Sequence, residues 1–274
     1  MLNAYLHKVC IITTTSLLIL SGCRPSASVL VHDGFIRKEL GDYEGAIEKL
    51  TRAIEADPDN EDAWFFRGDA RVSKGDYTNA LDDLDRAIEL NPSFHAAFNM
   101  RGNAKIQMGR PLAAIDDYTR AIELYPKYAR AYNNRGYARM TIDRKEEALS
   151  DFENALRHNP QYVIAMNNRG LAKYRLGMPE ESIDDFENTI TLDPEYVMAW
   201  FNMALAEFDL GNYNRSAMLL GRAVELDDKL TAGWLKLGYV RATMGNMTGA
   251  CESWYRAMEL GDLEAYYLIE ELCR

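Results

Sequence analysis

One unit of thirty-four residues recurs along most of this 274-residue chain and limits what the chain can fold into. The unit is clearest from Glu61 to Phe94, which reads EDAWFFRGDARVSKGDYTNALDDLDRAIELNPSF. Eight of its positions recur in kind thirty-four residues up or down the chain: Trp64, Gly68, Gly75, Tyr77, Ala80, Leu84, Ala87 and Pro92. A fixed period of this length indicates an array of stacked structural units.

Each repeated residue has a role in a pair of helices. Gly68 lies in the middle of the first expected helix, where glycine costs about 1 kcal/mol relative to alanine, so a neighbouring helix is expected to approach closely there. Gly75 suits the left-handed position after that helix, and Pro92 ends the second helix. Ala80 and Ala87 share one face of the second helix and permit close packing. One pair cannot bury its apolar face alone, so the pairs must stack.

A tryptophan, small residues and a terminal proline, in this order and at this period, resemble the tetratricopeptide repeat. The resemblance implies an all-α, right-handed α-solenoid of about seven helix pairs with a C-terminal capping helix. It also implies a non-catalytic protein that binds peptides or proteins on a concave face lined by the first helix of each pair. The expected solenoid covers residues 29–262, with repeats near 27–60, 61–94, 95–128, 129–162, 163–196, 197–230 and 231–262, and the cap covers residues 263–274.

The N-terminal sequence MLNAYLHKVCIITTTSLLILSGC has the shape of a secretory signal. Its uncharged run from Val9 to Leu20 is shorter than the roughly 20 residues that span a bilayer. The stretch Leu20-Ser21-Gly22-Cys23 resembles the lipobox of bacterial lipoproteins. That resemblance implies removal of residues 1–22, lipidation of Cys23, a short tether over residues 23–28, and a lipid-anchored protein that faces the periplasm from the outer membrane. The alternative is an ordinary signal peptide in which Cys23 is incidental.

Charge and missing motifs narrow the classes of function. The formal net charge is −11, so nucleic acid is not expected as a partner. His32, His95 and His158 lie in different repeats without metal-ligand spacing, so neither a metal nor a cofactor is expected. The sequence contains no GxxxxGK[ST] and no GxSxG motif. The alternative is an enzyme with an unrecognised pair of carboxylates.

A charge pattern separates the inner repeats from the outer ones. One position of the first helix is arginine in repeats two to five, namely Arg67, Arg101, Arg135 and Arg169. The second helices of the same repeats carry Asp82-Asp83, Asp116-Asp117, Asp151 and Asp184-Asp185. Where Met203 and Leu237 replace the arginine, the aspartates are also absent. The pattern predicts arginine–aspartate bridges between helices, and a basic stripe for an acidic ligand is the alternative.

Two cysteines flank the turn before the capping helix. Cys251 lies ten residues before Gly261, and Cys273 lies twelve residues after it. With a rise of about 1.5 Å per residue, two antiparallel helices bring these cysteines to about the same height. A disulfide is then plausible in an oxidising compartment, and two buried reduced thiols are the alternative.

Asparagines recur just before the arginine position of the first helices, at Asn99, Asn133, Asn134, Asn167, Asn168 and Asn202. Asn134, Asn168 and Asn202 are thirty-four residues apart, which predicts a ladder of amides along the concave face. Each amide offers a donor and an acceptor, which suits the backbone of an extended peptide. The ladder resembles one in the tetratricopeptide superhelix of a protein glycosyltransferase. The alternative is that these amides only bond neighbouring helices.

Aromatic residues further along the same helices are expected to form pockets for apolar side chains of the peptide, namely Tyr137, Tyr174, Phe208 and Tyr239. The alternative is that these rings belong to the core. The basic position of the clamp in chaperone-binding family members holds Ala96, Arg130 and Ile164 here, so a C-terminal carboxylate is a less favoured target.

The sequence therefore predicts a lipid-anchored scaffold that recruits proteins of the cell envelope. It resembles two kinds of bacterial lipoprotein, the adaptors that gather cell-wall hydrolases and the pilotins that help to assemble type IV pili. No residue chooses between these two. A self-associating structural protein is a third alternative.

Overall fold

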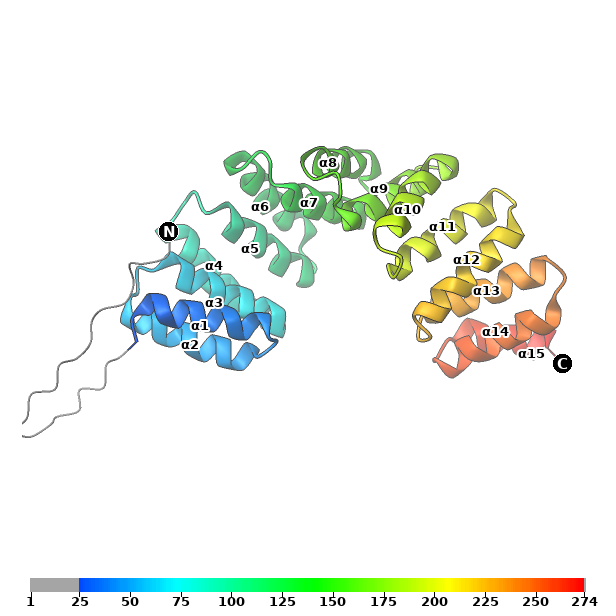
Figure 1. Ribbon diagram of the computed structural model, residues 1–274, viewed down its shortest axis with the longest axis horizontal. Coiled ribbons are helices and arrows are strands. Elements are labelled where there is room, and N and C mark those ends of the chain that lie inside the picture. Colours follow the sequence, from blue (N-terminus) through cyan, green and yellow to red (C-terminus); the bar gives the residue numbers. More distant parts are fainter. Residues whose placement is uncertain (1–24, 274) are drawn as a thin grey trace, which may run out of the picture.

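The computed structural model describes residues 25–273, and every regular element in this part of the chain is a helix (Figure 1). The helices within these residues form seven consecutive pairs and one final single helix. Their bounds are α1 Ala27–Glu39, α2 Tyr43–Ala56, α3 Glu61–Lys74, α4 Tyr77–Leu90, α5 His95–Gln107, α6 Pro111–Leu124, α7 Ala129–Thr141, α8 Lys145–His158, α9 Val163–Arg175, α10 Pro179–Leu192, α11 Val197–Asp209, α12 Tyr213–Leu226, α13 Thr231–Thr243, α14 Met247–Glu259 and α15 Leu263–Leu272. The predicted all-α solenoid of seven helix pairs and a cap is confirmed.

The first helix begins where repeat one was expected to begin. α1 starts at Ala27, which agrees with the expected repeat near 27–60 and overlaps the last two residues of the expected tether, 23–28. The reason for the overlap is tertiary packing, since Leu30 in the first turn is only 5% exposed and packs in a cluster with Ala53 of α2 and Ala63 of α3. No helix among residues 25–273 is long and apolar enough to cross a membrane.

The turn inside each pair follows the predicted glycine. Gly75 adopts φ +88° directly after α3, which is the left-handed conformation that ends a helix. Repeat four has Asp143 at this position, at φ 61°, and no other non-glycine residue in the described part of the chain has positive φ. The Asp143 carboxylate lies 3.0 Å from the ammonium of Lys145. An aspartate tolerates this conformation better than most side chains, so the turn is kept at a small cost.

The glycine in the middle of each first helix allows the paired helix to come close. A Cβ atom on Gly102 would lie 2.5 Å from the ring of Tyr118 on α6, and one on Gly136 would lie 2.7 Å from Phe152 on α8. Tyr118 and Phe152 are almost completely buried, so neither ring can swing away. The close approach that the sequence predicted is therefore present.

The recurring tryptophan and proline belong to one contact. The Trp64 indole N–H donates to the backbone carbonyl of Pro58 at 2.8 Å, and Trp200 donates to Pro194 at 2.9 Å. Trp234 makes the same bond, at 3.0 Å, to Asp228, which replaces the proline in the preceding turn. This bond thus ties repeats two, six and seven to the repeat before them, and because the acceptor is a backbone carbonyl, the proline side chain is not required for it.

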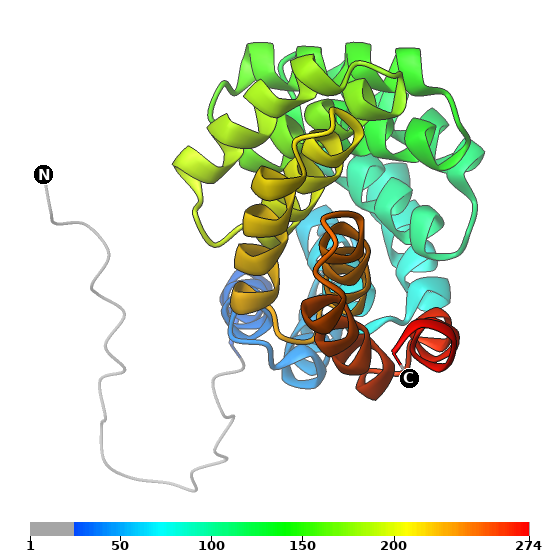
Figure 2. The same cartoon turned by 90° about the vertical axis from the view of Figure 1, so that its right-hand side faces the viewer.

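The helix pairs stack into an arch whose two arms are the N-terminal and C-terminal pairs (Figure 1). Successive odd-numbered helices from α1 to α11 contact one another, and α7 lies on the inner side of the arch with α8 outside it. Figure 2 shows the same stack turned by 90°, where its course is a wide superhelical turn. The odd-numbered helices therefore line the inner face, and most of the predicted site residues lie on them.

Candidate functional site

The predicted arginine–aspartate bridges are confirmed and lie inside the helix pairs. Arg67 reaches Asp83 at 2.7 Å, and the equivalent pairs are Arg101–Asp117 at 2.6 Å, Arg135–Asp151 at 2.7 Å, and Arg169–Asp185. All four aspartates are 4% exposed or less. Each guanidinium bonds the carboxylate through more than one nitrogen, which is the strong geometry for such a pair.

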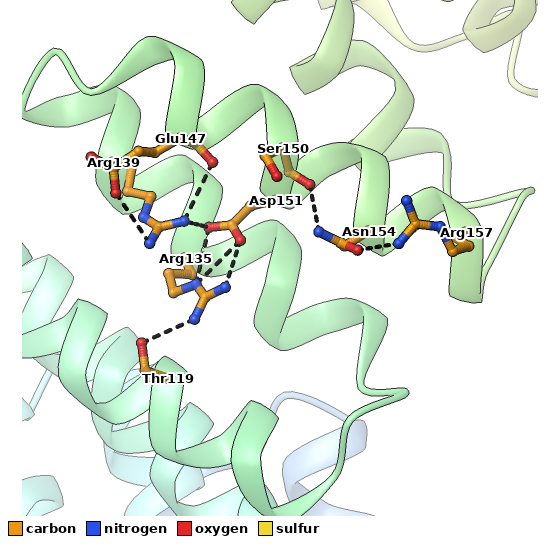
Figure 3. A network of polar contacts seen from close by, with 8 residues as sticks. All are labelled: Thr119, Arg135, Arg139, Glu147, Ser150, Asp151, Asn154 and Arg157. Carbon is orange, nitrogen blue, oxygen red and sulfur yellow. Dashed lines mark hydrogen bonds and ion pairs between the residues drawn. The ribbon is translucent and has the colours of Figure 1, made fainter.

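Each of these aspartates also holds a second cation, one helical turn further along the first helix. In Figure 3 the Asp151 carboxylate lies between Arg135 and Arg139, and Arg139 reaches its second oxygen at 2.6 Å. Arg135 also donates to the hydroxyl of Thr119 on α6, in the preceding repeat, at 3.1 Å. The arginines thus bond neighbouring helices to one another. The alternative of a basic stripe for an acidic ligand is wrong.

The asparagine ladder exists, but its amides bond one helix to the next. Asn202 donates to the Asn167 side-chain carbonyl at 3.1 Å, and Asn168 donates to that of Asn133 at 3.0 Å. Asn134 donates to Asn99 at 3.1 Å and to Asn103 at 3.0 Å. These bonds span thirty-five or thirty-one residues rather than thirty-four, so Asn134, Asn168 and Asn202 are not bonded to one another.

The predicted pairing with a peptide backbone is therefore wrong for the four buried asparagines, which bond neighbouring helices as in the alternative. Asn99, Asn133, Asn167 and Asn202 are 3% to 5% exposed. A buried amide must find its partners within the protein, and the nearest ones are the amides of the adjacent first helix. Asn134 and Asn168 are partly exposed. Both N–H groups of Asn134 are used, whereas Asn168 is bonded through its amide nitrogen alone.

Asn168 lines a small hollow of about 160 Å³ between α7 and α9. Tyr137, which is 51% exposed, forms one wall of this hollow, and Leu171 and Arg175 of α9 form part of the other. The partly exposed amide and the exposed ring are thus brought together at one place on the inner face. Tyr137 is in the position predicted for a peptide-binding aromatic.

The other three predicted aromatic residues line a single larger hollow. Tyr174 of α9, Phe208 of α11 and Tyr239 of α13 contribute to a space of about 460 Å³, which Leu205 also lines. This hollow and the one at Asn168 share helix α9 and so follow one another along the inner face. All three rings are partly exposed, and Phe208 and Tyr239 also pack against the core with part of their surface.

Acidic residues at the edge of the larger hollow hold two of these rings. The Tyr174 hydroxyl donates to the Asp209 carboxylate at 2.7 Å, and the Tyr239 hydroxyl donates to the Glu264 carboxylate of α15. Burial and the hydrogen bond to Asp209 raise the pKa of Tyr174 to about 12. Burial and the bond to Glu264 raise the pKa of Tyr239 to about 12 in the same way. Each hydroxyl donates its proton to the neighbouring carboxylate and so orients it.

Sequence reasoning did not identify three charged residues of this hollow, namely Asp209, Glu264 and Lys236. Asp209 takes the helix position that Arg175 takes one repeat earlier, and this change of sign was the signal available in the sequence. Glu264 belongs to the capping helix, whose docking position the repeat pattern does not specify. Its place in the site is a property of the tertiary structure.

A disulfide fixes that capping helix. Cys251 of α14 and Cys273 after α15 are bonded, with their Cα atoms 5.8 Å apart. Glu264 lies in the first turn of the same helix, so the bond also fixes one wall of the larger hollow. Cys23, the expected lipidation site, lies outside the described residues. Within residues 25–273 no group of three or more His, Cys, Asp or Glu residues could hold a metal ion.

Comparison with known proteins agrees with this architecture. The sequence profile of the tetratricopeptide repeat (TPR) family matches residues 37–93, 99–162, 139–197 and 168–230. A comparison with curated protein sequences gives no match.

Solved structures share the fold at low sequence identity. A chain of the APC/C hetero-tetramer Cut9-Hcn1 superposes with a TM-score of 0.77 and 15% identity over 93% of this chain, which spans about half, 51%, of that chain. PilF of Pseudomonas aeruginosa gives 0.68 and 20% identity over 77% of this chain and 97% of its own. YrrB, described as a TPR protein with an unusual peptide-binding site, gives 0.55 and 20% over 67% and 95%. With a profile that matches more than half of its residues, this chain belongs to the tetratricopeptide repeat family.

Proposed function

We propose that this protein is a scaffold that binds an extended segment of a partner protein along the inner face of its C-terminal half. The observation that carries the proposal is the pair of hollows on either side of α9, which hold all four predicted aromatic residues. Pockets at regular intervals along one face suit side chains that leave an extended backbone in sequence. TPR proteins as a family bind peptides or proteins.

Exposed apolar side chains on the first helices support the same surface. Tyr137 of α7, Ile164 of α9 and Met198 of α11 are each between 42% and 51% exposed. They lie on three successive odd-numbered helices, which together line the inner face. Exposed apolar side chains on neighbouring helices suit a surface that a partner covers. The partly free amide of Asn168 lies beside it and can bond to a peptide backbone whatever its sequence.

The proposal includes attachment to the cell envelope through a lipidated Cys23. Its support is the lipobox-like sequence at Leu20–Cys23. The Cys251–Cys273 disulfide suits an oxidising compartment such as the periplasm. A role as a pilotin-like assembly factor is a narrower form of this proposal. The likeness to PilF, at 20% identity, supports the shared fold alone.

Site-specific photocrosslinking tests the binding surface. Tyr137 on the inner face and Tyr255 on the outer helix α14 are 51% and 45% exposed, so they form a matched pair. Each is replaced in turn by benzoylphenylalanine in the full chain, which is irradiated in envelope extracts of the source cell. We expect a crosslinked partner from position 137 and none from position 255. Equal adducts from both positions, or adducts from position 255 alone, would rule out the inner face as the binding surface.

The membrane attachment has its own test. Cys23→Ser should leave the helix content unchanged and move the protein from the membrane fraction to the soluble fraction. The acyl chains proposed for Cys23 supply the anchoring. Retention of the variant at the membrane, or a mature N-terminus at another residue, would contradict the lipoprotein assignment.

A further inference from the structure

The larger hollow combines aromatic walls with carboxylates, and the geometry points to a basic side chain as its ligand. We infer that it receives a lysine or arginine side chain of the partner segment. This inference rests on the proposed function and names the chemistry recognised at one of its pockets. A guanidinium or ammonium group fits such a place because ring faces attract cations and carboxylates accept their hydrogen bonds.

The carboxylates are oriented and still have capacity for another donor. Asp209 receives the Tyr174 hydroxyl on one oxygen, and Glu264 receives the Tyr239 hydroxyl on one oxygen. Each carboxylate can accept several hydrogen bonds. The two groups come from α11 and from α15, so they approach the hollow from different helices. Both side chains are exposed, and a ligand can reach them without unfolding the repeat.

The chain's own Lys236 already places a cation over one ring of this hollow, that of Tyr239. Its ammonium lies 5.5 Å from the centroid of the Tyr239 ring. Lys236 is the one cation among the residues that line the hollow, against Asp209 and Glu264, so the lining keeps one net negative charge. The charge of the whole chain, −11, adds to the attraction for a basic segment.

The neighbouring hollow at Tyr137 and Asn168 has the opposite charge, so the two ends of the binding surface differ. Arg175 lines the hollow at Tyr137 and Asn168, and no acidic residue lines it. A partner segment with a basic side chain at the larger hollow and an apolar or acidic side chain toward Arg175 would match both hollows. The inner face can thus specify which way an extended segment runs.

Parallel selections test the inference. A random decapeptide display library is selected against the full-length wild type, against Asp209→Asn/Glu264→Gln, and against Asp184→Asn/Glu252→Gln. The control pair removes the same two charges from exposed residues of the outer helices α10 and α14. Circular dichroism checks that all three proteins are folded. We expect lysine or arginine to be enriched at one position with the wild type and the control, and not with the Asp209/Glu264 variant.

Substitution of one selected peptide makes the result quantitative. Replacing its basic residue with citrulline, which keeps the shape of arginine and loses the charge, should weaken wild-type binding about tenfold. With the Asp209→Asn/Glu264→Gln variant, the same replacement should weaken peptide binding by less than about twofold. Lys236→Met should tighten binding of the basic peptide, because the competing cation is removed.

Each contrary outcome has a distinct meaning. Selected peptides without basic enrichment, or equal binding of the arginine and citrulline forms, would overturn the inference and leave the proposed groove intact. Enrichment of acidic residues that is lost in Lys236→Met would also overturn it. Failure of the wild type to enrich any peptide would overturn both the inference and the proposed binding of extended segments.

Discussion

Repeats two to five and repeat six build the same helix pair with different chemistry at the same place. In the inner repeats a buried aspartate joins the two helices through two cations, as at Asp185 with Arg169 and Lys173. One repeat later the arginine and aspartate positions hold Met203 and Leu219. These two side chains are 3% and 4% exposed and pack in one apolar cluster with Phe186, Leu220 and Leu237.

The position of the second cation, Lys173 in repeat five, holds an acidic residue in repeat six. Glu207 lies thirty-four residues after Lys173 and is completely buried. Arg215 lies 3.0 Å from its carboxylate, and Asn212 donates to it at 2.7 Å. The comparison shows that the backbone arrangement tolerates an ion pair or an apolar contact, provided that no charge is left alone. This agrees with the general finding that a buried ion pair can be exchanged for apolar groups of similar volume, whereas half of it cannot be removed.

Removing the aspartate from one arginine–aspartate pair of repeats two to five should therefore cause the largest loss of stability. Asp151→Ala leaves Arg135 and Arg139, whose side chains are 14% and 17% exposed, without their shared carboxylate. We expect a loss of about 3–5 kcal/mol in the free energy of unfolding, measured by urea titration with circular dichroism. Asp184→Ala, at an exposed residue on α10, is the control and should change it by less than about 0.5 kcal/mol.

The apolar pair of repeat six can be introduced at the equivalent positions of repeat four. Arg135→Met combined with Asp151→Leu should recover at least half of the loss, because Arg139 keeps Glu147 at 3.3 Å. A double variant as unstable as Asp151→Ala would mean that the two regions differ in more than this pair of side chains.

The disulfide should make the next largest contribution, in the C-terminal region that lacks the arginine–aspartate pairs of repeats two to five. Cys251→Ser/Cys273→Ser opens a loop with a sequence separation of 22, and the chain-entropy relation gives a loss of about 3 kcal/mol. We expect faster amide hydrogen exchange in α15 and unchanged exchange in α5 to α8. Dithiothreitol should reproduce this in the wild type and have no effect on the variant. Uniform acceleration along the chain would contradict a local role.

The asparagine ladder crosses from one region to the other, and its bonds should matter in both. Asn202→Ala removes the bond to Asn167 and leaves that carbonyl, at 4% exposure of the residue, without its donor. The expected loss is about 1–3 kcal/mol in the free energy of unfolding. Asn214→Ala, at an exposed residue on α12, should be close to neutral. Equal effects of the two substitutions would show that the ladder does not stabilise the stack.

Substituting one glycine in each region by alanine should give the smallest changes in stability, and the two changes should have opposite signs. Gly221 lies inside α12, and a Cβ atom added there would have nothing within 4 Å, so Gly221→Ala should stabilise by about 1 kcal/mol. Gly102→Ala in α5 would place its Cβ 2.5 Å from Tyr118 and should destabilise instead. Melting temperatures of the two variants should move in opposite directions. A shift of both in the same direction would contradict the close approach at Gly102.

The sequence by itself determined the thirty-four-residue repeat and the arginine–aspartate pairs inside it. Residues such as Gly75 and Asp83 have roles that depend on contacts within one unit or one neighbour, so their spacing of thirty-four residues was sufficient. The four aromatic residues of the inner face could be named for the same reason, since each helix presents one known face to the groove.

The tertiary structure decided how polar groups are shared between units. The sequence shows that Asn134, Asn168 and Asn202 recur, but the twist of the stack sets each amide against an asparagine one position off that period. It likewise brings Glu264 of the cap to Tyr239 of α13 across a turn whose docking angle no periodic pattern encodes. Spacing along the chain fixes which face of a helix a residue occupies, whereas the angle between helices fixes which groups meet there.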